Sequence, residues 1–135
     1  MPWKTRFLPV AAVLAAFAFA VPFLMAGIGD GGWISRVPEK DRLRPNPFAG
    51  DTHAVAAGAK LFRQNCSKCH GAEGVGQEKK PALRSDRIRQ ATPGELEWLL
   101  TNGSMKNGMP SWSRLPQPQR WQIVTYIKEL VRGRP

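Results

Sequence analysis

The sequence predicts a small all-α domain of about three to four helices, preceded by an N-terminal hydrophobic helix. Three observations carry this prediction. Residues 51–135 contain two segments with apolar side chains at helical spacing and a third bounded by helix start and stop signals, nothing between them has the alternation of a strand, and residues 7–29 contain no charged side chain. A chain of 135 residues has room for one such domain and little more.

Residues 1–29 have the features of a signal peptide or a membrane anchor. The uncharged run at 7–29 follows two basic residues, as it does in an export signal or a transmembrane helix. Ala18 and Ala20 form an A-x-A pattern that a signal peptidase could cut, but the cut would leave a bare apolar end, so we favour an uncut anchor. More basic residues follow the run than precede it, against the positive-inside tendency. We still expect the domain on the outer side, because a whole domain can translocate despite nearby charge.

Residues 30–50 are rich in Gly, Pro and charged side chains and show no helical or strand period. The sequence therefore predicts a flexible linker over 30–50 and a domain over 51–135. A domain of that size buries only a modest fraction of its surface. We therefore expect it to depend on a disulfide, a metal or a large apolar cofactor.

The first helix of the domain is expected between Asp51 and Cys66, where Val55, Ala59 and Phe62 have helical spacing. Asp51 or Thr52 could cap its start. The last helix is expected over residues 117–132, and its apolar side is formed by Trp121, Val124, Ile127 and Val131.

A middle helix is predicted by its two ends. Thr92 is expected to be the N-cap, Pro93 occupies the first helical position, and Glu95 completes a capping box. The pair Asn102-Gly103 is a stop signal, so we expect the helix to end there.

Both cysteines of the chain lie in the stretch CSKCH, as Cys66 and Cys69, and His70 follows directly. This is the attachment sequence of c-type haem, because the two thiols reach the two vinyl groups of one porphyrin and the imidazole lies under the iron. A zinc site needs four ligands, and only His53 is left among the usual soft donors. A thioredoxin-like pair would need a βαβ unit, and a structural disulfide would leave the histidine unexplained. We therefore predict one covalently attached haem c.

With these features the chain resembles the class I c-type cytochromes over nearly all of residues 51–135. In that family a first helix leads into CxxCH, a later loop delivers a methionine to the iron, and a C-terminal helix crosses the first. Gly58 and Phe62 match the family's close-contact glycine and aromatic residue. Ile123 and Tyr126 match the crossing positions on the last helix. The resemblance implies the small cytochrome c fold, wrapped around the haem.

The stretch KKPALRS resembles the Pro-x-Leu that follows the haem motif in this family, with Pro81 and Leu83 in those positions. The resemblance implies that the carbonyl of Pro81 accepts the ring N–H of His70. Such a bond would fix the orientation of the imidazole and raise its basicity.

Two methionines, Met105 and Met109, are candidates for the other face of the iron. Met109 stands between a glycine and a proline in a turn-forming stretch, and this Gly-Met-Pro resembles the ligand loop of the family. Met105 lacks the proline, and a lone methionine is usually core filler. We therefore favour Met109 as the second axial ligand, with His53 as runner-up. Trp112 could pack at the haem edge or simply within its loop.

An iron with His70 and Met109 at its two axial positions has a raised reduction potential and no open site for a substrate. The sequence therefore predicts a monohaem carrier of single electrons between redox partners, and not an enzyme. Two alternatives stay open. The domain could be a cytochrome subunit of a dehydrogenase or terminal oxidase complex. It could also be a haem enzyme or gas sensor with an open sixth site, which would be favoured if Met109 does not bind the iron.

The chain is basic, with 20 Lys and Arg against 10 Asp and Glu, which predicts an anionic partner or surface. The charges are scattered singly and form no reading motif, so we expect no nucleic-acid partner. Some of them could ring the haem edge and steer redox proteins with acidic docking surfaces, although general solubility explains any one of them equally well. These residues are Lys60, Arg63, Lys68, Lys79, Lys80 and Lys106. We expect the protein in the periplasm, tethered to the inner membrane by its N-terminal segment.

Overall fold

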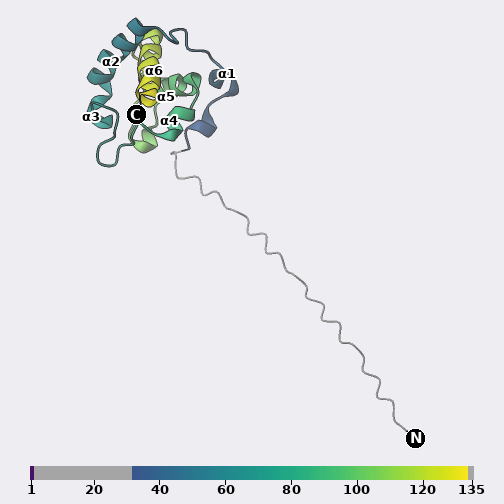
Figure 1. The fold of residues 1–135 in the computed structure, drawn as a ribbon. Coiled ribbons are helices and arrows are strands. Elements are labelled where there is room, and N and C mark those ends of the chain that lie inside the picture. Colours follow the sequence, from purple (N-terminus) through teal and green to yellow (C-terminus); the bar gives the residue numbers. More distant parts are fainter. Residues whose placement is uncertain (2–31, 134–135) are drawn as a thin grey trace.

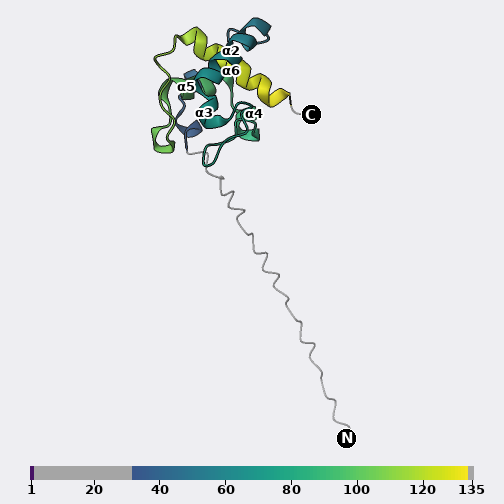
Figure 2. The same ribbon diagram turned by 90° about the vertical axis from the view of Figure 1, so that its left-hand side faces the viewer.

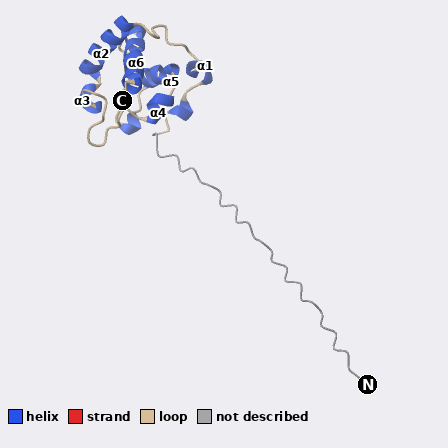
Figure 3. Ribbon diagram, in the orientation of Figure 1, coloured by secondary structure: helices blue, strands red, loops and turns tan. Residues whose placement is uncertain are grey.

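Helices α2 (Thr52–Asn65) and α6 (Gln117–Arg132) lie against each other, with α6 in the middle of the fold and α2 along one side (Figure 1). The computed structural model describes residue 1 and residues 32–133. Within these residues the fold is helical and contains no strand, only two isolated bridges (Figure 3). Helix α5 (Pro93–Asn102) packs against α6. The other helices are short: η1 (Ile34–Arg36), α1 (Glu39–Arg42), α3 (Ser67–His70), α4 (Asp86–Gln90) and η2 (Met105–Asn107).

The three helices that the sequence predicts are all present, and the small all-α class is confirmed. Asp51 caps α2, since its carboxylate accepts hydrogen bonds from the backbone N–H of His53 and Ala54. Thr92 and Glu95 form the expected capping box at the start of α5. The predicted N-terminal hydrophobic helix lies outside the described residues. Among those that are described, no helix is long and apolar enough to span a membrane.

The crossing of α2 and α6 depends on Gly58. A Cβ atom at this position would lie 2.0 Å from the carbonyl oxygen of Gln122 and 2.9 Å from the Cβ of Tyr126. Only a glycine therefore lets the two backbones approach so closely. The rings of Phe62 and Tyr126 meet across the same crossing with centroids 5.3 Å apart, and Phe62 is fully buried.

The prediction of a flexible linker over residues 30–50 is wrong for the part that the structure describes. Residues 32–50, called the N-terminal strap below, run along α5 (Figure 2). Trp33 and Val37 are buried in the same core as α2, α5 and α6. Gly94 makes room for the strap, since a Cβ there would lie 2.0 Å from the carbonyl oxygen of Asp41. The strap is thus part of the domain, because burial of its apolar side chains is more favourable than their exposure to water in a free linker.

Two arginines of the strap form ion pairs with carboxylates of α5. Arg42 Nε lies 3.2 Å from a carboxylate oxygen of Glu95. Arg44 forms an ion pair with Glu97 and also lies over the ring of Trp121, 5.2 Å from its centroid. These two arginines therefore hold the strap against α5 and α6.

Candidate haem-binding site

The CSKCH stretch forms a helical turn at the end of α2. Cys66 is the C-cap of α2, and α3 begins at the next residue. The backbone N–H groups of Cys69 and His70 donate to the carbonyl of Cys66 at 3.1 and 2.9 Å. Residues three and four positions apart are neighbours on a helix. The turn therefore places Cys66, Cys69 and His70 on one side, as attachment to a single porphyrin requires.

The two thiols are free and differ in their surroundings, since Cys66 is buried and Cys69 is exposed. Burial raises the pKa of the Cys66 thiol to about 12, and the neighbouring Cys69 adds to the shift. Thiols that act as nucleophiles or zinc ligands need the thiolate form. The Cys66 thiol therefore does not have the depressed pKa that is typical of a reactive CxxC.

The ring of His70 is oriented by a backbone carbonyl from the following loop. His70 Nδ1 lies 2.9 Å from the carbonyl oxygen of Pro81, as the family resemblance implies. With Nδ1 as the donor of this bond, Nε2 is the nitrogen left to bind a metal. Leu83 is half-buried against the core.

The loop that carries the two methionines is folded by its own backbone. Ser104 and Met109 form an isolated antiparallel bridge, with N–O distances of 2.8 and 3.1 Å. Gly103 precedes this bridge with a φ of +70°, and a Cβ there would lie 2.6 Å from the backbone nitrogen of Ser111. The Gly-Met-Pro stretch therefore has a defined conformation.

The two methionines have different surroundings. Met109 is half-buried and packs against the hydrophobic core. Met105 lies on η2 with 73% of its surface exposed. A side chain turned toward the interior is the better candidate for a ligand of a core-bound group, so the structure favours Met109 over Met105.

The remaining two candidates are placed differently. His53 is exposed in the first turn of α2, whereas Cys66 follows the last turn. The rise of a helix puts these two residues roughly 20 Å apart, so His53 is not brought to the CSKCH turn. Trp112 is half-buried against the core, and the guanidinium of Arg114 lies 4.1 Å from the centroid of its ring.

The described residues fit a haem in their donor set and in their apolar surroundings. They supply two thiols and one oriented imidazole on one helical turn, and a methionine on a folded loop. Several apolar side chains from α2, α5 and the loops pack on the core but are only partly covered, and a large apolar cofactor would cover more of such a surface. They include Leu61, Leu83, Leu99, Met109, Trp112 and Leu115.

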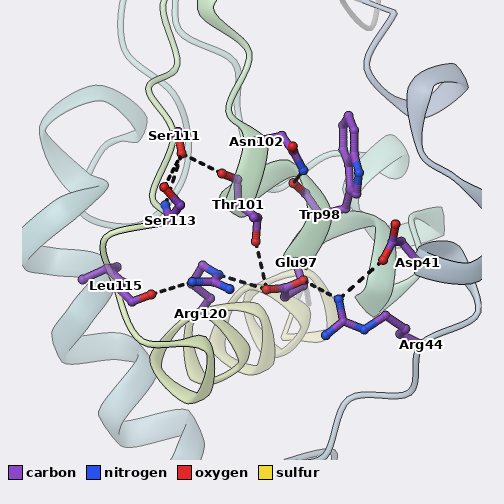
Figure 4. A network of polar contacts seen from close by, with 10 residues as sticks. All are labelled: Asp41, Arg44, Glu97, Trp98, Thr101, Asn102, Ser111, Ser113, Leu115 and Arg120. Atoms are coloured by element: carbon purple, nitrogen blue, oxygen red, sulfur yellow. Dashed lines mark hydrogen bonds and ion pairs between the residues drawn. The ribbon is translucent and has the colours of Figure 1, made fainter.

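Sequence reasoning missed a buried polar network beside the methionine loop (Figure 4). Glu97 and Arg120 are 2% and 8% exposed and pair with each other. The only sequence signal for the burial of Glu97 is a weak one, its place next to Leu96 on α5. A helix that is covered on one side only would leave Glu97 in water. The N-terminal strap covers this second side.

Comparisons with known proteins bear on the family of the chain. The family described as cytochrome c oxidase, cbb3-type, subunit III matches residues 53–127. A quinohemoprotein alcohol dehydrogenase, ADH-IIG, of Pseudomonas putida is 33% identical over 67% of this chain. The cbb3-type cytochrome c oxidase subunit CcoP of Rubrivivax gelatinosus is 27% identical over 98% of the chain, and cytochrome c550 of Pseudomonas aeruginosa is 31% identical over 62%. The chain spans 12%, 50% and 61% of the lengths of these three relatives.

Proposed function

The chain belongs to the cbb3-type cytochrome c oxidase subunit III family of class I c-type cytochromes, and from this premise we propose that it carries single electrons between redox proteins in the periplasm. A haem bound at the CSKCH turn supplies an iron that changes between the ferric and ferrous states. Cys66 and Cys69 would hold this group through thioether bonds, and His70 would bind the iron through Nε2. The bond from Nδ1 to the carbonyl of Pro81 would keep the imidazole in one orientation.

Met109 is proposed as the second axial ligand. The observation that carries this assignment is the contrast between a half-buried Met109 in a loop closed by backbone hydrogen bonds and an exposed Met105. A methionine in this position raises the reduction potential and closes the iron to external ligands. The protein would then transfer electrons without binding a substrate at the metal, so we propose no enzyme activity for the domain by itself.

The test compares Met109→Leu with Met105→Leu in the haem-loaded protein. The unchanged protein should show the methionine–iron charge-transfer band when oxidised and no response to CO when reduced. Met109→Leu should remove the band, lower the potential and admit CO, because leucine offers no lone pair to the iron. Met105→Leu is the matched control and should change none of these. The opposite pattern would transfer the assignment to Met105, and an unchanged protein that binds CO would favour the gas sensor or haem enzyme.

The redox partners are proposed to have acidic docking surfaces. Lys68, Lys79 and Lys106 are exposed on elements that follow α2 or belong to the methionine loop. Such charges raise the association rate by about 10- to 1,000-fold at low salt. The rate of electron transfer to an acidic redox protein should therefore fall steeply as ionic strength rises, and the triple substitution of these lysines by glutamine should flatten that dependence. An electron-transfer rate that does not change with ionic strength would contradict this part of the proposal.

A second candidate, a cytochrome subunit of a larger complex, is favoured by the relatives themselves. They include an oxidase subunit and a quinohemoprotein dehydrogenase. Residues 1–29 are proposed as a membrane anchor that would keep the domain next to such a complex. Washing membranes with alkaline carbonate and then purifying the tagged protein in detergent separates the possibilities. Release by carbonate would rule out the anchor, and co-purification of an oxidase or dehydrogenase would favour the subunit role.

A further inference from the structure

The carboxylate of Glu97 joins three parts of the fold. Its Oε2 accepts a hydrogen bond from Arg44 of the N-terminal strap at 3.0 Å. Its Oε1 accepts from Arg120 of α6 at 2.9 Å and from the hydroxyl of Thr101, one turn further along α5, at 3.0 Å. The side chain is 2% exposed. Figure 4 shows all these partners pointing toward the carboxylate.

Two branches of this network lead into the segment between α5 and α6, residues 103–116, which carries Met109. In the first branch, Arg120 Nη1 donates to the carbonyl of Leu115 at 2.5 Å. In the second, the hydroxyl of Ser111 donates to the carbonyl of Thr101 at 2.6 Å. Ser111 lies two residues after Met109, so the segment is tied both just after the methionine and near its end.

A buried carboxylate needs a structural reason, since removing a charge from water is costly unless it is fully paired. Glu97 is paired with two guanidinium groups, and one of them, that of Arg120, bonds to Glu97 through Nε and to the carbonyl of Leu115 through Nη1. Without the carboxylate, the charge of Arg120 would be buried without a partner, and its side chain would turn toward water. The segment would then lose the hydrogen bond at Leu115.

We propose that Glu97 is a positioning residue for the axial methionine: it fixes residues 103–116 through Arg120 and Thr101 and so keeps Met109 on the iron. This inference rests on the proposed ligation by His70 and Met109. An external ligand can bind the iron only in the fraction of molecules whose methionine has left it, so its apparent affinity measures that fraction. Glu97 would lower the fraction through its hydrogen bonds within the protein.

The test measures the affinity of imidazole for the oxidised haem protein in Glu97→Gln and Glu95→Gln. Glu95 is the matched control, because it lies on the same helix, is 5% exposed, and bonds to Thr92 and Arg42, not to residues 103–116. Loss of one charge-assisted hydrogen bond should raise imidazole affinity about tenfold in Glu97→Gln and weaken the charge-transfer band. Glu95→Gln should lose stability in urea and keep the affinity within about twofold of the unchanged protein.

Equal imidazole affinity in the two variants, whether raised or not, would overturn the positioning role, since the effect would then follow global stability. Arg120→Lys provides a milder test should Glu97→Gln fail to take up haem. Lysine keeps the charge beside Glu97 but cannot also reach Leu115, so imidazole affinity should rise, and an unchanged affinity would overturn the inference. An unchanged protein without the charge-transfer band would refute the methionine ligation and this inference together. A normal charge-transfer band in the unchanged protein, together with an imidazole affinity that Glu97→Gln does not change, would refute this inference alone.

Discussion

Replacing Gly58 by alanine should separate the two central helices. The added Cβ would lie 2.0 Å from the carbonyl oxygen of Gln122, and such contacts are not found below 3.0 Å. The contacting atom belongs to the backbone of α6 and cannot rotate away. The helices must therefore move apart by about 1 Å at the crossing, which also loosens the contact between Phe62 and Tyr126.

The cost follows from the lost dispersion contacts. A gap of about 1 Å forfeits roughly a quarter of the attraction at the least, and a large buried side chain has roughly 50 contacts worth about 0.15 kcal/mol each. The loss is then about 2 kcal/mol for each of Phe62 and Tyr126, or about 4 kcal/mol together. Alanine returns about 1 kcal/mol through its higher helix propensity. The net destabilisation should be about 3 kcal/mol.

Urea unfolding of the haem protein, followed by far-UV circular dichroism, measures this loss. With an m value of about 1.5 kcal/mol/M, the midpoint should fall by about 2 M. Ala56→Gly, on the exposed side of the same helix, calibrates the propensity contribution and should cost about 1 kcal/mol. A Gly58→Ala protein as stable as the unchanged one would refute the close-approach argument.

Three further predictions use the same unfolding assay. Thr92→Ala removes the capping box of α5 and should cost about 1 kcal/mol, whereas Thr52→Ala should cost little, because Asp51 caps α2. Trp33→Ala should cost about 3–5 kcal/mol and expose residues 32–50 to proteolysis; a cost near zero would mean that the strap is not part of the core. Lys128→Met should cost about 1–2 kcal/mol, because the ammonium donates to the carbonyls of Ile88, Arg89 and Ala91 at the end of α4. Lys128→Arg should recover part of that loss, and equal losses in the two variants would contradict this role.

The three long helices could be predicted because their signals are local. The apolar spacing in α2 and α6 and the capping residues of α5 lie within each segment, and no distant partner is needed to interpret them. The CSKCH turn could be predicted for the same reason, since five consecutive residues define it. The contact between His70 and Pro81 could be expected only by resemblance, because Pro81 lies in a loop eleven positions after His70.

The N-terminal strap could not be predicted, because its stability is tertiary. Trp33 and Val37 lie among glycines, a proline and charged residues and show no period. Their burial depends on a surface that α5 and α6 form together. The burial of Glu97 could not be predicted for the same reason, since that side of α5 is covered only once the strap is in place.

The folded strap also bears on how far the domain could move away from a membrane anchor. Gly32 already accepts hydrogen bonds from Ser35 and Arg36, so the strap is bonded to itself from residue 32 onward. If residues 1–29 are the anchor proposed above, two residues lie between that anchor and the strap, and two residues can span at most about 7 Å, against roughly 25 Å for a flexible linker of the predicted length. With that anchor, the domain could not search a wide volume for its partner. It would exchange electrons only with proteins that lie next to it in the same membrane.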